Sequence, residues 1–208
     1  NLSLFDEQQT VDAIAIASGP GSFTGLRIGS ATAKGLGLAL EIPIIEIPTL
    51  DGLACNLYGT DKVVCPIMDA RRNQVYTGLY SYIEDGQSDE QEQSFHYTLV
   101  PILSQCAVPI EEIAEKCNEQ QKEIIFLGDG VPVFAAQLKN LMKVPYSFAP
   151  AHLNKQRAGA VGALAVQYYK EGHTVTAEEH RPEYLRMSQA ERERMEKEQA
   201  EASHAAAD

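Results

Sequence analysis

Residues 19–29 read GPGSFTGLRIG, a glycine-rich stretch typical of a turn that leads into a helix. The short, β-branched run Val11–Ser18 precedes it and predicts a buried strand that stops at the glycine. After the turn, the sequence predicts a helix that ends near Leu40. A second apolar strand over 42–47 and a second helix over 49–58 follow. The order β-α-β-α indicates an α/β fold in which helices connect parallel strands.

The rest of the chain predicts a second run of strands and helices. Residues 74–83 alternate: Tyr76, Tyr80 and Tyr82 share one side and Val75 and Leu79 the other, which predicts a half-buried strand. Other predicted strands cover 62–68, 95–100, 123–127 and 146–149, and predicted helices cover 109–120, 132–142 and 156–171.

The helix after the glycine turn carries a stripe of small residues. Gly25, Gly29, Ala33 and Gly37 recur every four positions and therefore share one side of the helix. A glycine inside a helix costs roughly 1 kcal/mol relative to alanine, which a chain tolerates where another backbone approaches closely. Two interpretations remain open at this point. The stripe packs on the protein's own sheet, or it forms an interface with another subunit.

Phosphate-binding motifs are incomplete in this turn. No glycine is followed by Lys and Ser/Thr at P-loop spacing, and Gly19, Gly21 and Gly25 are one residue too far apart for the dinucleotide fingerprint. Two later stretches end predicted strands, where ligands of α/β folds gather. Asp69-Ala70-Arg71-Arg72 is either a site or a turn with a local ion pair, and Gly128-Asp129-Gly130 either approaches a nucleotide or caps a helix.

The composition excludes several classes of protein. The 208 residues carry a net charge of −12, which argues against an autonomous nucleic-acid binder. The five histidines form no H-x-x-x-H pair, and there is no G-x-S-x-G motif, so neither a zinc peptidase nor a serine hydrolase is indicated. The apolar runs are too short for a membrane span. We expect the four cysteines to be free thiols and the protein to be cytoplasmic.

Five sequence blocks together resemble one family. GPGSFTGLRIG lies between DAIAIAS and TAKGLGLAL, and IPIIEIPTLDGLA, CPIMDARRNQVYTGLY, LGDG and PEYLR follow in order from about residue 12 to residue 186. In these blocks the chain resembles the TsaB (YeaZ) family. The resemblance implies an actin-like ATPase (ASKHA, RNase H-like) α/β fold with two lobes. It also implies a part in forming N6-threonylcarbamoyladenosine beside the anticodon of tRNAs.

The resemblance implies an accessory subunit and not an enzyme. The expected partners are a TsaD-like catalytic subunit, a TsaE-like ATPase and, when the chain is alone, a second copy; tRNA would be held through the complex. No catalytic residue, metal ligand or tightly bound cofactor is expected, while ATP or ADP at the junction with the partner would lie near Asp69, Gly128, Asp129 and Gly130. The alternatives are a nucleotide-binding phosphotransferase of the same fold and a glycoprotease-type metallopeptidase.

The resemblance also assigns the interface. In relatives the helix after the glycine turn contributes to dimers or to the contact with TsaD, so the expected interface residues are Gly25, Arg27, Ile28, Gly29, Thr32, Ala33, Leu36 and Gly37. The family's first strand, hairpin and helix have no counterpart in these residues, so we expect an incomplete first lobe over 1–60. A second lobe over 61–181 and a C-terminal segment with a polar, disordered tail over 182–208 would follow. We further expect the isolated chain to expose apolar surface and to self-associate.

Overall fold

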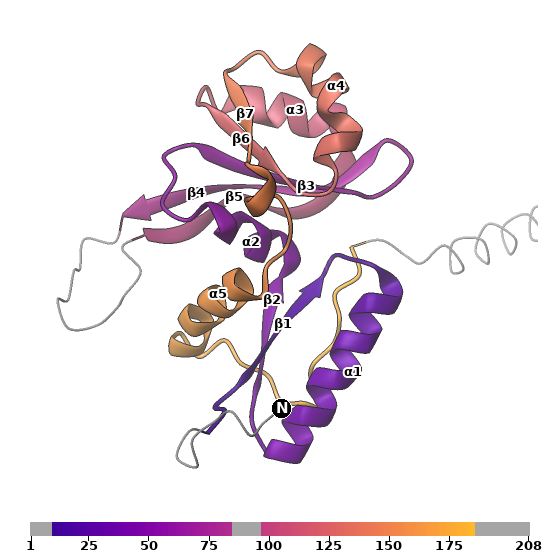
Figure 1. The fold of residues 1–208 in the computed structure, drawn as a ribbon, viewed down its shortest axis with the longest axis vertical. Helices are drawn as coiled ribbons and strands as arrows, with labels where there is room; N and C mark the ends of the chain where they lie inside the picture. The colour runs from indigo at the N-terminus through magenta and orange to yellow at the C-terminus, as the bar shows by residue number, and fades with distance from the viewer. Residues whose placement is uncertain (1–9, 85–96, 186–208) are drawn as a thin grey trace, which may run out of the picture.

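The computed structural model describes residues 10–84 and 97–185. It contains two sheets, arranged one above the other in an elongated molecule (Figure 1). The predicted polar tail over 187–208 and the N-terminal residues 1–9 lie outside the described residues.

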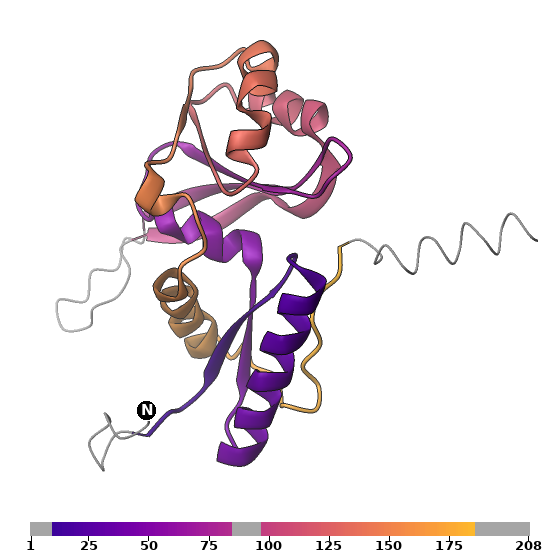
Figure 2. The same cartoon turned by 45° about the vertical axis from the view of Figure 1, so that its right-hand side comes forward.

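The first sheet consists of two parallel strands connected by one helix. The strands β1 (Ile14–Gly19) and β2 (Ile44–Pro48) pair in parallel, with Ile14 opposite Ile44. The connecting helix α1 (Phe23–Leu40) lies along one side of the pair, as the turned view in Figure 2 shows. The predicted strand, turn, helix and strand are therefore confirmed. After β2 the chain forms α2 (Thr49–Ala54) and a single 3-10 turn, Cys55–Leu57.

The second sheet has five strands in the order β5-β4-β3-β6-β7. The strands β3, β4 and β5 are antiparallel neighbours, whereas β3, β6 and β7 run parallel. The elements of this part are β3 (Val63–Asp69), β4 (Gln74–Glu84), β5 (Tyr97–Pro109), α3 (Ile110–Glu119), β6 (Ile124–Leu127), α4 (Val131–Leu141) and β7 (Tyr146–Phe148).

The alternation along β4 leads to burial on both sides of the sheet. Val75 and Leu79 belong to a core with residues of α3 and α4, while Tyr80 belongs to a second core with residues of α2. The prediction of a half-buried strand is therefore wrong for the first part of β4. Helices cover both sides of this part of the strand. The side that would otherwise face solvent therefore carries tyrosines and not charged residues.

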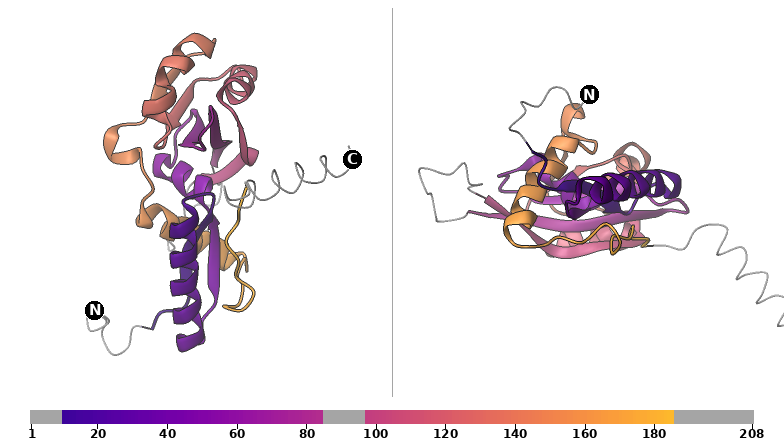
Figure 3. Two further views of the ribbon diagram at one scale, coloured as in Figure 1. Left: turned by 90° about the vertical axis from the view of Figure 1, so that its right-hand side faces the viewer. Right: turned by 90° about the horizontal axis from the view of Figure 1, so that it is seen from below.

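The end of the described chain returns to the first sheet. Helix α5 (Ala158–Lys170) packs Leu164 and Ala165 on Ile45 and Ile47 of β2. The following residues 174–183, called the strap here, run beside α1 and β2 (Figure 3). Val175 and Ile44 exchange two backbone hydrogen bonds of 2.9 Å, which adds the strap to the free edge of β2. The expected boundary between residues 60 and 61 separates the two sheets. Helix α5 and the strap, which belong to the expected second lobe, bury apolar residues against β2 of the first sheet.

Candidate functional site

Three of the four residues of the small-residue stripe of α1, Gly29, Ala33 and Gly37, face the protein's own sheet and strap, whereas Gly25 is exposed. Ala33 is buried, and Gly29 lies so that a Cβ there would stand 3.4 Å from Cδ1 of Ile16. A Cβ on Gly37 would meet the carbonyl oxygen of Ile42 at 3.2 Å and the Cβ of Ala177 at 3.3 Å. Ala33 and Gly37 are thus covered by this chain and are removed from the expected interface. The interpretation as close packing on the own sheet holds for them, because the sheet and the strap approach the helix there.

The opposite side of α1 is exposed and apolar. Ile28 is 64% exposed and Leu36 45%. We call this surface the outward face of α1, and it consists of Gly25, Ile28, Ala31, Thr32, Gly35, Leu36 and Ala39. None of these side chains carries a charge, and a Cβ on Gly35 would have no heavy atom within 4 Å. The outward face therefore combines exposed aliphatic groups with a glycine that packs against nothing in the described chain.

Arg27 lies beside this face near the start of the helix. Its guanidinium group stands 3.9 Å from the ring centroid of Phe23, an arrangement that favours a cation–π interaction. Ser22 caps the helix, since its hydroxyl oxygen accepts a hydrogen bond from the backbone N–H of Gly25 at 3.4 Å. Of the expected interface residues, Gly25, Arg27, Ile28, Thr32 and Leu36 remain accessible. Gly35 and Ala39, which flank the stripe in sequence and were not among the expected interface residues, are exposed beside them.

Two glycine loops of the same form meet at the junction of the two sheets. Gly19-Pro-Gly21 joins β1 to α1, and Gly128-Asp-Gly130 joins β6 to α4. The first glycine of each loop has a positive φ, 133° and 112°, and a Cβ on either would stand 2.1 Å from a backbone carbonyl oxygen. Both glycines are therefore required by close backbone packing.

A cleft of about 470 Å³ lies between these loops. It is lined by Ile16, Ala17, Pro20, Gly21, Ser22, Gly25, Leu26, Gly29, Thr49, Met68, Asp129 and Gln156. The lining includes one carboxylate, that of Asp129, and no lysine or arginine. The phosphates of a nucleoside triphosphate in this cleft would meet the carboxylate of Asp129 and no lysine or arginine of the lining.

The expected nucleotide-proximal residues have structural partners instead. The Asp69 carboxylate accepts a hydrogen bond from the Arg71 backbone N–H at 2.8 Å and pairs with the Arg71 guanidinium group at 3.1 Å. A Cβ on Gly130 would stand 2.9 Å from the carbonyl oxygen of Ile67. Asp69 thus closes the turn after β3, and Gly128 and Gly130 let that strand approach the loop. Among these residues Asp129 lines the cleft.

A buried carboxylate links the two sheets at a point that sequence patterns did not indicate. Asp51 of α2 accepts hydrogen bonds from the hydroxyl groups of Tyr80 at 2.7 Å and Tyr168 at 3.4 Å. Burial raises the pKa of Asp51 above its ordinary value, although both hydrogen bonds oppose the rise. Burial and the charge of Asp51 together raise the pKa of Tyr168 to about 12. Asp51 thus connects α2, β4 and α5.

Within residues 10–84 and 97–185, no group of three or more His, Cys, Asp or Glu side chains is arranged to hold a metal ion. The helices in the same part of the chain are too short or too polar to cross a membrane.

Comparisons with known proteins agree on one family. The family model described as tRNA N6-adenosine threonylcarbamoyltransferase (TsaD) matches residues 7–194. The tRNA threonylcarbamoyladenosine biosynthesis protein TsaB of Bacillus subtilis is 32% identical over 88% of this chain and 73% of its own length. The protein of the same name from Escherichia coli is 30% identical over 85% and 71%.

Solved structures agree with the sequence relatives. A structure titled YeaZ from Pseudomonas aeruginosa has a TM-score of 0.63 at 28% identity and covers 84% of this chain and 74% of that one. An uncharacterised protein from the same organism, described as similar to peptidase YEAZ, has a TM-score of 0.62 at 28% identity over 85% and 74% of the two chains. The match to the family model and the two TsaB relatives extend over most of the chain, and the mixed α/β fold is that of the YeaZ structures. The chain therefore belongs to the TsaB/YeaZ family.

Proposed function

We propose that this chain takes part in the biosynthesis of N6-threonylcarbamoyladenosine in tRNA as a non-catalytic subunit that docks a TsaD-like catalytic partner. The names of the related TsaB proteins support the pathway. The observation that carries the docking role is the outward face of α1, which is apolar, uncharged and open at Gly35. Apolar, tightly packing centres of this kind supply most of the energy of protein interfaces.

The small residues of the outward face favour a helix as the contacting element. Gly25, Ala31, Gly35 and Ala39 are small enough for a second backbone to approach closely, and Ile28 and Leu36 are large enough to insert between its side chains. A partner of the same fold offers its equivalent helix. The TsaD family model matches this chain over residues 7–194, so the two proteins are expected to share that helix.

The proposed arrangement of the molecule is the two-lobe actin-like fold. Its support is the repeated unit of strand, glycine loop, helix and parallel strand, which occurs as β1-α1-β2 and again as β6-α4-β7. The two units face the same cleft. A TsaE-like ATPase as a third component, and a homodimer of the free chain, stay predictions.

The phosphotransferase alternative has no specific support in the site. Its expected residues, Asp69 and the Gly128–Gly130 loop, serve the turn and the strand packing described above. The cleft between the lobes also carries no cation for a phosphate group.

The affinity of a single-residue variant for the partner tests the docking role. Ile28→Asp places a charge in the centre of the outward face, and we expect it to weaken binding to the TsaD-like protein of the same organism by about thirtyfold or more. Val133→Asp on α4 is the matched control, since Val133 is 55% exposed on the other sheet. Affinities are measured by isothermal titration calorimetry. Equal affinities for the wild type and Ile28→Asp would overturn the proposal.

A further inference from the structure

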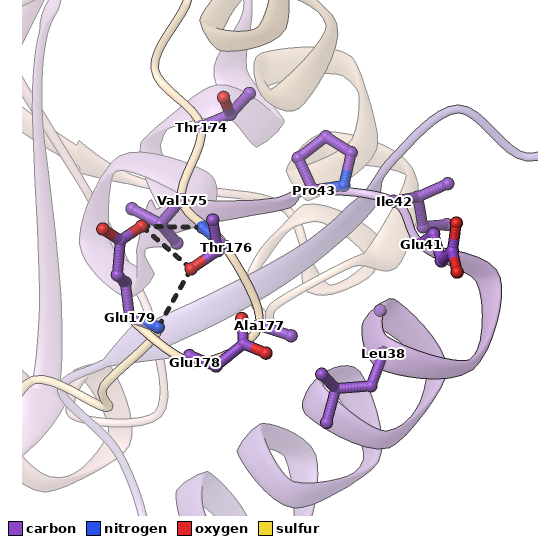
Figure 4. Close-up of a pocket in the computed structure, with 11 residues that line it drawn as sticks. Leu38, Glu41, Ile42, Pro43, Thr174, Val175, Thr176, Ala177, Glu178 and Glu179 are labelled. Carbon is purple, nitrogen blue, oxygen red and sulfur yellow. Dashed lines mark hydrogen bonds between the residues drawn. The ribbon is translucent and has the colours of Figure 1, made fainter.

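A groove of about 450 Å³ lies at the C-terminal end of α1, between the turn to β2 and the strap (Figure 4). Its apolar surface comes from Leu38 of α1, from Ile42 and Pro43 of the turn, and from Val175 and Ala177 of the strap. Leu38 is 56% exposed. The groove therefore offers aliphatic surface that the described chain leaves uncovered.

Three carboxylates and no cation stand among the lining residues. Glu41 lies on the α1 side of the groove, and Glu178 and Glu179 lie across from it on the strap. Glu179 accepts hydrogen bonds from the Thr176 backbone N–H at 3.1 Å and from its hydroxyl at 2.9 Å. These bonds hold the pKa of Glu179 below its ordinary value, so that its charge is kept at neutral pH.

Two cations lie beside the groove, and both bind a backbone oxygen and not a carboxylate of its lining. Lys34 donates to the backbone carbonyl oxygen of Glu178 at 3.4 Å, and Arg181 donates to the same oxygen. Within the described residues, the carboxylates of Glu41 and Glu178 have neither a hydrogen bond nor an ion pair. The lining of the groove itself therefore carries three carboxylates and no basic side chain.

Glu41 is an unfavourable residue for its position in two respects. It ends α1 in the left-handed region with φ 55°, where glycine is the preferred residue. It also adds a negative charge at the negative end of the helix dipole, and the last turn of α1 carries no basic residue. Within the described residues the Glu41 side chain has no hydrogen bond or ion pair that would offset either cost; its backbone N–H bonds to the carbonyl oxygen of Gly37. A residue that disfavours folding in this way indicates a role in binding rather than in folding.

The groove is continuous with the outward face of α1. Leu38 follows Gly35 by three positions and Ala31 by seven, so these residues form one row along the helix. A partner that packs on Gly35 and Ala31 therefore reaches Leu38 and the groove mouth.

We propose that this groove binds a lysine or arginine side chain of the same TsaD-like partner that docks on α1. This proposal rests on the docking role proposed above. The aliphatic stem of the side chain lies on Leu38, Pro43 and Val175, and the cationic head reaches Glu41 and Glu178. Since both carboxylates lose part of their hydration on docking, the ion pairs fix the orientation of the partner helix along α1.

The double substitution Glu41→Gln with Glu178→Gln tests the groove. Its matched control is Glu115→Gln with Glu119→Gln, which removes two exposed charges from α3 on the other sheet. We expect the groove variant to bind the partner about tenfold more weakly than the control at low ionic strength. We also expect the difference to shrink at high ionic strength, because salt screens the pairs. Equal affinities of the two variants would overturn the proposal.

Glu41→Gly separates binding from folding. Glycine suits the left-handed cap, so we expect a higher melting temperature for the free chain together with weaker partner binding. A rise in melting temperature with unchanged affinity would contradict the proposal.

The outcomes distinguish the two proposals. If the wild type binds the partner, Ile28→Asp does not, and the groove variants bind like the control, the groove proposal fails and the docking role stands. If the wild type does not bind the TsaD-like protein, both proposals fail.

Discussion

The Asp51 carboxylate lies between the hydroxyl groups of Tyr80 and Tyr168, and both hydroxyls donate hydrogen bonds to it. Its raised pKa means that the folded chain binds this proton more tightly than the unfolded chain does. The contribution of Asp51 to stability is therefore fully present below its ordinary pKa of 3.8 and is lost as the pH rises through the folded value. Asp51 thus holds three elements together at the cost of a buried charge.

Substitution of Asp51 separates the hydrogen bond from the charge. In Asp51→Asn the amide oxygen still accepts from the Tyr80 hydroxyl, so we expect unchanged or higher stability at neutral pH. Asp51→Ala leaves that buried hydroxyl without a partner and should cost about 1–3 kcal/mol. Urea denaturation near pH 4 and at neutral pH measures both. Should Asp51→Asn lose as much stability as Asp51→Ala at neutral pH, the carboxylate would have to be favourable in its charged form.

The four cysteines differ in accessibility. All four are free thiols; Cys65 and Cys117 are buried, and Cys55 and Cys106 are half-buried. A hydrogen bond with Cys65, together with burial, raises the pKa of Cys117, and burial raises those of Cys55 and Cys106. Because the thiolate is the reactive form, we expect slow modification of the half-buried pair and modification of the buried pair only on unfolding. Ellman's reagent with and without urea measures this. Four fast thiols in the native chain would contradict it.

At the scale of the elements, α1 has two sides with opposite requirements. The inner side carries Ala33 and Gly37 against β2 and the strap, while the outer side carries Gly35 against open space. Glycine is thus required by close packing at position 37, whereas at position 35 it contacts nothing in the described chain.

The pair Gly35→Ala and Gly37→Ala tests this difference. Alanine at Gly35 meets no atom, so the free chain should gain roughly 0.5–1 kcal/mol from the better helix former. Alanine at Gly37 would press on the carbonyl oxygen of Ile42 and on Ala177, so that variant should be destabilised by about 1–3 kcal/mol. Thermal denaturation of both variants gives the comparison. A stabilised Gly37→Ala variant would contradict the prediction, because the strap would then move away from the added methyl group at little cost.

At the scale of the whole molecule, contacts between distant segments connect the two sheets. Glu183 of the strap donates its backbone N–H to the carbonyl oxygen of Ser18 at 2.7 Å, and its carboxylate accepts from the side chain of Gln105 on β5 at 2.5 Å. Tyr80 and Asp51 form a second connection. The chain thus closes on itself at the junction, while the outward face of α1 stays open on the surface.

The open face predicts self-association of the isolated chain. Apolar groups at Ile28 and Leu36 gain free energy by leaving water, so the apparent mass should rise with protein concentration. Ile28→Asp should abolish this rise and Val133→Asp should retain it, as measured by sedimentation velocity over a range of concentrations. A wild-type chain that stays monomeric at every concentration would contradict the prediction.

Local signals in the sequence determined most of the elements of this protein. The glycine turn at residues 19–29, the apolar runs on either side of it and the later alternation at 74–83 predicted the correct element types, because turn chemistry and periodicity act over a few residues. They also gave the order β-α-β-α and, through the five blocks, the family.

Only the tertiary structure decided which side of α1 is free. Both sides carry small residues, and the choice depends on Ile42, Ile44 and Ala177, which reach the helix through the chain's return along the strap. The buried Asp51 and the acidic groove likewise arise from segments far apart in sequence. Burial is a property of such distant contacts, so the sequence determined the helix and its composition, and the packing decided which part of it a partner can reach.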